Sequence, residues 1–207
     1  MNKEESIKLL KESIADWNKY RKDNPNWIPD LRQVDLRQAD LRRANLWRAN
    51  LRQVDLSDAN LRQANLITTN LSEGNLSGAN LWRVNLRHVD FMEVDLSKAN
   101  LVTTNLSGVD LRQADLWEAD LWKADLRRVD LRQADLKFAD LRGADLRGAN
   151  LNDANLNDAN LRQADLRQAD LSKANLTGAN LSGVNLMDTE LDGAIFNEKY
   201  ILSKEGQ

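Results

Sequence analysis

The sequence predicts an all-β solenoid, a coil of short extended segments, with an amphipathic helix at its N-terminal end. Three observations predict this fold: a five-residue repeat that runs without a break through most of the chain, a leucine at the centre of nearly every unit, and a small residue two places before each leucine. Repetition at a fixed short period is typical of solenoids, in which each unit packs only against its neighbours.

The first 28 residues hold the predicted helix and a linker. Within residues 3–22, four apolar residues follow one another at spacings of three and four: Ile7, Leu10, Ile14 and Trp17. This spacing places them on one face of a helix. The helix is expected to end near Asn24-Pro25, and Trp27 lies in the linker that follows. We expect residues 1–28 to cap the first coil, with Trp27 at the junction. The alternative is a helix that binds a partner or a membrane surface.

The repeat occupies residues 29–196. From Leu31 to Leu191 every fifth residue is Leu except Phe91, and Phe196 continues the register. Ala or Val fills 29 of the 33 positions that lie two places before these residues, and Asp or Asn immediately precedes nearly all of them. The two residues after each Leu vary and are mostly polar. The unit is therefore A/V-D/N-L-x-x.

The five-residue period excludes ordinary secondary structure. Five residues advance an α-helix by about 500°, so successive leucines would not share a face. In a straight strand they would alternate between faces. Every Leu stays inside only if the chain turns once in each unit. Residues 29–196 are therefore predicted to form a coil around stacked ladders of Leu and Ala or Val, and residues 197–207 are expected to close its C-terminal end.

The segment ADLRQADLSKANLTGANLSGVNL resembles the pentapeptide-repeat family, and the opening WNKYRKDNP with PDLRQVDL is similar to its cyanobacterial members. The resemblance implies a right-handed quadrilateral β-helix with four units in each 20-residue coil, about eight coils here. It also implies one of two roles, an interaction scaffold of unknown function or a DNA mimic that binds gyrase. Two basic faces, a short tail and the absence of loop insertions favour the scaffold, with gyrase modulation as the alternative.

The composition excludes several classes of chemistry. The chain has no Cys and one His, His88, which rules out disulfides, Cys-based zinc sites and most His-dependent catalysis. No segment has the apolar run of a secretory signal or a membrane span. We therefore expect a cytoplasmic, monomeric protein that is no enzyme and takes neither metal nor cofactor.

The net charge of −3 conceals an uneven distribution. With four units per coil, two faces carry an excess of cations at the variable positions. The face that starts at Leu41 carries Arg42, Arg43, Arg62, Arg83, Lys123, Arg142 and Arg162, and the face that starts at Leu46 carries Arg48, Arg87, Arg127, Arg128, Arg147 and Arg167. Such faces predict weak binding of a polyanion such as nucleic acid. The alternative is that these cations pair with neighbouring acids and only keep the rod soluble.

Acidic residues follow one another closely in the middle of the repeat. All eight residues that precede a Leu between Asp110 and Asp145 are Asp. We expect the cations two residues beyond to compensate them, namely Arg112, Arg127, Arg132, Lys137, Arg142 and Arg147.

Large apolar residues also occur at outward positions. Trp82, Val102 and Trp122 are equivalent residues of three successive predicted coils, and Trp117 lies one unit before Trp122. Because a covered Trp buries a large area, this group predicts a patch that binds an unidentified protein or a second copy of the chain. The alternative is that the stems of neighbouring Arg and Lys side chains cover the indoles.

Overall fold

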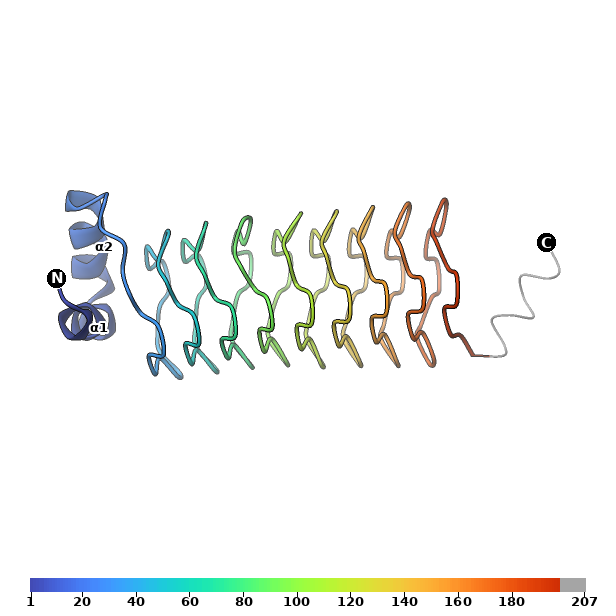
Figure 1. The fold of residues 1–207 in the computed structure, drawn as a ribbon, viewed down its shortest axis with the longest axis horizontal. Helices are drawn as coiled ribbons and strands as arrows, with labels where there is room; N and C mark the ends of the chain where they lie inside the picture. The colour runs from blue at the N-terminus through green and yellow to red at the C-terminus, as the bar shows by residue number, and fades with distance from the viewer. Residues whose placement is uncertain (198–207) are drawn as a thin grey trace.

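The computed structural model describes residues 1–197, which form two helices at the N-terminal end of a long stack of coils (Figure 1). Single-residue parallel bridges join residues that lie 20 apart, such as Asp30 with Asn50 and Asn100 with Asp120. One turn every five residues and a stacking register of 20 give four sides to each coil. The four-unit coil expected from the resemblance is therefore the register of the structure.

The turn in each unit follows its leucine. The carbonyl of Leu121 accepts a hydrogen bond from the backbone N–H of Ala124 at 3.0 Å, and the same bond recurs along the repeat. The residue before that donor, here Lys123, has a φ of 53°, and the equivalent residue has a positive φ in all 33 units. A type II turn requires a positive φ at this position. The chain thus changes direction once in every unit.

The Asp or Asn before each leucine supports this turn. Oδ1 of Asn100 accepts the backbone N–H of Val102 at 3.1 Å, and Oδ1 of Asp120 accepts that of Trp122 at 3.1 Å. This is an Asx turn, in which a short side chain replaces a backbone acceptor. Asp and Asn both carry Oδ1, which explains why the two residues interchange at this position.

The interior is a continuous apolar core. The central Leu residues from Leu31 to Leu176 and Phe91 are buried, as are most of the Ala and Val residues that precede them. Backbone bonds join successive coils, for example from Leu121 N–H to the Asp140 carbonyl at 2.8 Å. In the last coil, Leu181, Leu186 and Leu191 are only half-buried. The predicted closing tail lies, except for Asn197, outside the described residues.

The N-terminal segment forms two helices where the sequence predicted one. These are α1 (Lys3–Glu12) and α2 (Ile14–Asp23), and they are separated by Ser13, whose φ is −151°. The Ser13 hydroxyl accepts the backbone N–H of Asp16 at 3.1 Å, so this residue is the N-cap of α2. The apolar face predicted from the spacing does pack inward. Leu10 and Trp17 are buried, and Ile7 and Ile14 pack against the core.

Side chains of α2 contact the edge of the first coil. The buried Arg21 donates to the backbone carbonyls of Trp27, Asn45 and Trp47, and Trp17 Nε1 donates to the Asn45 carbonyl at 2.9 Å. The Trp27 ring packs edge-on against Trp17, with centroids 5.5 Å apart. Burial lowers the pKa of Arg21, and the nearby Arg48 adds to this effect. Carbonyls at the first edge of the stack, which have no preceding coil, thus receive donors from α2.

Candidate interaction surface

A recurring three-residue sequence forms ion pairs on the outer surface. The sequence Asp-Leu-Arg occurs nine times, and in each case the guanidinium pairs with the carboxylate two residues earlier at 2.5–2.7 Å. The arginines are Arg32, Arg37, Arg42, Arg112, Arg127, Arg132, Arg142, Arg147 and Arg167. The Asx turn places the side chains before and after each leucine on the same side, so no other element is needed to form the pair.

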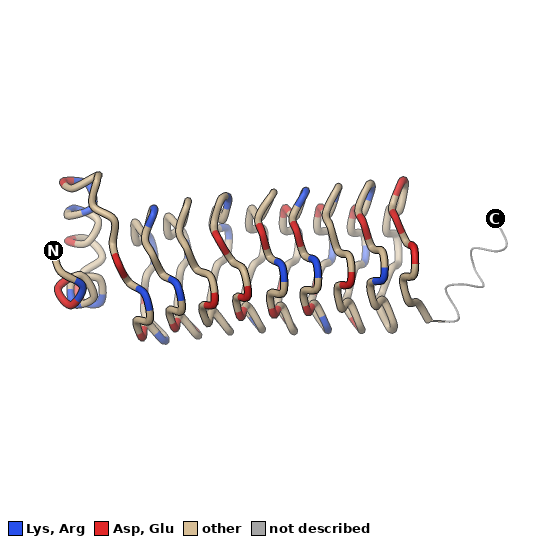
Figure 2. Tube along the Cα trace, in the orientation of Figure 1, with Lys and Arg blue, Asp and Glu red and all other residues tan. Residues whose placement is uncertain are grey.

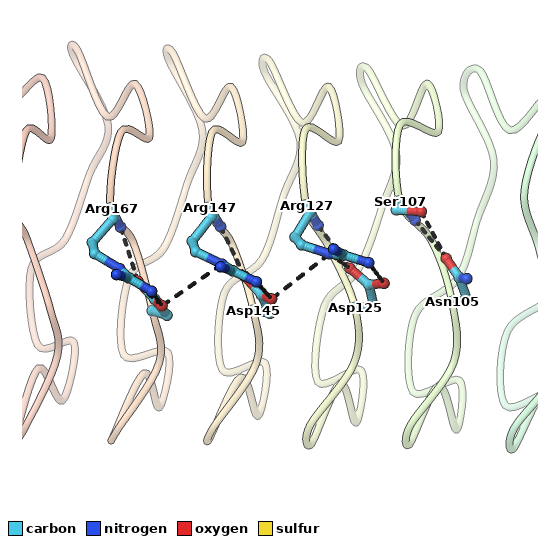
Figure 3. A network of polar contacts seen from close by, with 8 residues as sticks. Asn105, Ser107, Asp125, Arg127, Asp145, Arg147 and Arg167 are labelled. Atoms are coloured by element: carbon cyan, nitrogen blue, oxygen red, sulfur yellow. Dashed lines mark hydrogen bonds and ion pairs between the residues drawn. The ribbon is translucent and has the colours of Figure 1, made fainter.

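Several of these pairs also connect coils. Arg127 lies 3.7 Å from Asp145 of the next coil, and Arg147 lies 3.8 Å from Asp165 (Figure 3). The result is a ladder of alternating charge along one face, beside the uncharged pair of Asn105 and Ser107. The hydrogen bond from the guanidinium is the main cause that lowers the pKa of Asp125 and of Asp165.

The expected compensation of the acidic run is confirmed for Arg112, Arg127, Arg132, Arg142 and Arg147. It is wrong for Lys137, which forms no ion pair with any described residue and whose ammonium lies 4.9 Å from the Phe138 ring centre. A planar guanidinium binds a carboxylate with two parallel donors, whereas an ammonium has no such fork.

The 13 cations of the two predicted basic faces fall into two groups. Five are neutralised by the Asp two residues earlier: Arg42, Arg127, Arg142, Arg147 and Arg167. Eight have no ion pair within residues 1–197: Arg43, Arg48, Arg62, Arg83, Arg87, Lys123, Arg128 and Arg162. Figure 2 shows the basic and acidic residues interspersed along the coils. The basic faces are therefore interrupted rather than continuous.

Whether an arginine directly after a leucine pairs with a carboxylate depends on the residue directly before that leucine. Arg62, Arg87 and Arg162 follow Asn60, Asn85 and Asn160, whose amides carry no charge. These amides still accept the backbone N–H of the arginine, at 3.1–3.3 Å, so the turn is kept without the ion pair. A fourth such arginine, Arg52, pairs instead with Glu73.

The structure places Trp82, Val102 and Trp122 in consecutive coils, because bridges join Asn80 to Asn100 and Asn100 to Asp120. Trp82 is half-buried between Arg62 and Arg83, whose guanidinium carbons lie 4.6 and 5.3 Å from its ring centre. Trp122 is 38% exposed and has the Lys123 ammonium 4.5 Å from its ring centre. We call these six residues the tryptophan face.

Trp117 and its surroundings lie on the adjoining side of the coil. The Lys98 ammonium is 4.6 Å from the Trp117 ring centre, and Trp117 is half-buried. Phe138, one coil further on, is 46% exposed and was missed by the sequence reasoning. The available signal was a large aromatic residue at the second variable position, which is polar or Gly in every other unit.

The described residues offer no metal centre and no membrane span. No three His, Cys, Asp or Glu residues among positions 1–197 are arranged to hold a metal ion. Neither α1 nor α2 has the length and apolar character that crossing a bilayer requires. His88 lies exposed on the surface.

The family comparison agrees with this architecture. The family described as Pentapeptide repeats matches residues 30–66, 69–108, 110–148, 149–188 and 164–198. This chain belongs to the pentapeptide repeat family. Two cyanobacterial pentapeptide repeat proteins of known structure are similar to it in sequence. HetL of Nostoc sp. strain PCC 7120, involved in heterocyst differentiation regulation, is 33% identical over 87% of this chain and 96% of its own, with a TM-score of 0.27.

The second is Rfr23 of Cyanothece 51142, which is 32% identical over 64% of this pentapeptide repeat protein and 86% of its own chain, with a TM-score of 0.38. QnrB1, a plasmid-mediated fluoroquinolone resistance protein, is 17% identical over 87% of this chain and 97% of its own, with a TM-score of 0.36. A comparison with functionally curated proteins finds no match.

Proposed function

We propose that this pentapeptide repeat protein is a non-enzymatic scaffold that binds a protein partner through the tryptophan face. The observation that carries the proposal is the combination of two tryptophans with three cations that have no carboxylate partner within residues 1–197. Trp and Arg are the residues most often found to dominate binding energy at protein interfaces. The partner surface should offer carboxylates beside apolar side chains.

Asn60 keeps Arg62 of this face free of an ion pair, because an asparagine amide carries no charge. Arg83 and Lys123 stand two places after their leucines, where they lie over Trp82 and Trp122 and form no ion pair within residues 1–197. In the flanking units, Asp40 and Asp140 neutralise Arg42 and Arg142. The cation directly after the leucine is thus neutralised in both flanking units and free at Arg62, which supports a binding site centred on Arg62 and the two tryptophans.

The coil also holds this face in one arrangement. Thr103 N–H donates to the Trp122 carbonyl at 3.0 Å, and Arg83 N–H donates to the Val102 carbonyl at 3.2 Å. These bonds fix the backbone that carries the exposed side chains, so binding requires little ordering of the main chain. We propose further that the protein acts as a cytoplasmic monomer, which light scattering of the purified chain tests for oligomeric state.

A pull-down from an extract of the source organism tests the proposal. The wild-type chain should retain a protein that the double variant Trp82→Ser/Trp122→Ser no longer retains. Trp47→Ser is the matched control, because Trp47 is also covered by a cation, Arg48, but lies outside the tryptophan face. Circular dichroism should show all three chains folded. Retention of the same proteins by the double variant would contradict the proposal.

Gyrase modulation by DNA mimicry stays an expectation from the family resemblance alone. A protein that mimics DNA must present uncompensated negative charge, whereas nine carboxylates here are paired with their own arginines. A supercoiling assay with purified gyrase tests this alternative. Inhibition by the wild-type chain that persists in the Trp82→Ser/Trp122→Ser variant would favour it over the scaffold.

A further inference from the structure

An open groove of about 550 Å³ lies on the side of the coil that starts at Leu46. Its lining includes four arginines and two glycines, namely Arg87, Arg127, Arg128, Arg147, Gly108 and Gly148. None of these residues belongs to the tryptophan face. A ligand of this groove would therefore contact other residues than the protein partner proposed above.

Glycines produce the shape of the groove. The second variable position in successive coils on this side reads His88, Gly108, Arg128, Gly148 and Gln168. Each glycine removes a side chain from this column. On the Gly148 side the Arg128 stem lies close, with its Cγ 3.6 Å from where a Cβ would be, whereas the Gly108 side is an open notch. A Cβ added to Gly108 would meet no atom within 4 Å, which shows that this notch is empty.

The groove carries uncompensated positive charge. Arg127 and Arg147 are paired with Asp125 and Asp145. Arg87 and Arg128 have no ion pair in the described part of the chain. The residues that precede the leucines of the first two coils here are the neutral Asn85 and Asn105, so no carboxylate competes for Arg87.

We propose that this groove binds an oligophosphate, a short chain of phosphate groups either free or as the tail of a nucleotide. Guanidinium groups bind phosphate oxygens with paired, charge-assisted donors. Arginines face the groove from three coils, with the coil of Ser107 and Gly108 between Arg87 and the others, and this spread suits an extended ligand with several anionic groups better than a single compact anion. The groove is open to solvent, so its affinity for the ligand falls steeply with salt.

Isothermal titration with tripolyphosphate, ATP and sulfate, each at low and high salt, tests the proposal. Tripolyphosphate should bind at one site at low salt, more tightly than sulfate and more weakly as salt rises. ATP that binds as tightly as tripolyphosphate identifies the phosphate chain as the recognised group in either source. No binding of tripolyphosphate at low salt, or sulfate binding equally well, would overturn the proposal.

Two variants assign the binding to this groove. Asn85→Asp completes an Asp-Leu-Arg sequence, draws Arg87 into an ion pair, and should weaken tripolyphosphate binding about tenfold, as expected for one charge-assisted hydrogen bond. Gly108→Gln fills the notch and should weaken it similarly. Glutamine is tolerated at this backbone position, since Gln113 has a φ of 59°.

Asn160→Asp is the matched control. It creates the same ion pair with Arg162, which does not line the groove, and should leave binding unchanged. An equal loss in Asn85→Asp and Asn160→Asp would show a diffuse charge effect and contradict the assigned site. Thermal melting of each variant should show that the coil is intact.

Discussion

Asp125 accepts two different kinds of hydrogen bond from Arg127. Its Oδ1 accepts the backbone N–H at 3.3 Å, and the guanidinium donates to Oδ1 and to Oδ2, each at 2.7 Å. The backbone bond supports the turn and is available to Asp and Asn alike, whereas the ion pair requires Asp. One position in the repeat therefore supports the fold and, independently, sets the charge of the surface.

Substitution of Asp125 separates these two contributions. Asp125→Asn should keep the turn and lose the ion pair, which lowers the free energy of unfolding by at most about 1 kcal/mol. Asp125→Ala loses the turn acceptor as well and should cost about 1 kcal/mol more. Urea unfolding of both variants measures the difference. Equal stability of the two would show that the Asx turn contributes nothing here.

The ion pairs predict that the fold becomes less stable in acid. Mainly through its hydrogen bond, Arg32 lowers the pKa of Asp30 to about 2, and Arg37 does the same for Asp35. Because these pKa values are lower in the folded chain than the value of about 3.9 expected when unfolded, the pairs stabilise the fold above about pH 4. That contribution is lost as the pH falls towards 2. The melting temperature should therefore fall between pH 4 and pH 2, and less so in a variant with Asp30→Asn and Asp35→Asn.

The core predicts that its Ala positions tolerate a change of side-chain size less well than its Leu positions. Ala124 and Leu121 are both fully buried. Ala124→Leu overfills a site sized for a methyl group and should cost about 1–3 kcal/mol, whereas Leu121→Met keeps the volume and should cost less than about 1.5 kcal/mol. Thermal melting compares the two. Equal melting temperatures would contradict the assignment of small interior positions.

Arg21 offers a test of the proposal that residues 1–28 cap the first coil. Arg21→Met keeps an unbranched stem but removes the donors to three backbone carbonyls, so we expect a loss of about 2 kcal/mol or more. Lys19→Met, an exposed position on the same helix, is the control and should be nearly neutral. If both variants unfold at the same urea concentration, α2 does not stabilise the coil.

The repeat made it possible to predict which residues lie in the interior. Because its period admits only a coil, the inward position of every Leu, and of Phe91, followed from the sequence, while the four-unit coil came from the family resemblance. The interruption at Ser13 was not predictable from the spacing of apolar residues, since that spacing continues from Leu10 through Ile14 to Trp17. The break depends on a serine that acts as an N-cap, a role that competes with helix continuation.

The surface was predictable in part. Pairing of Arg127 and Arg147 with the Asp two residues earlier was expected from the sequence and is present. Lys137 has the same spacing but lies over the Phe138 ring instead, because an ammonium lacks the two parallel donors of a guanidinium. Cations over Trp82 and Trp122 were expected as the alternative to an open apolar patch, and both are present.

The most direct test of the account is the affinity of the captured partner for an Asn60→Asp variant. This change completes an Asp-Leu-Arg sequence and should draw Arg62 from Trp82 onto the new carboxylate, without altering either tryptophan. Titration calorimetry should show binding about tenfold weaker than wild type, at an unchanged melting temperature. Asn160→Asp is the control and should bind as wild type does. An affinity of Asn60→Asp equal to that of wild type would contradict the claim that Asn60 keeps Arg62 free to bind the partner.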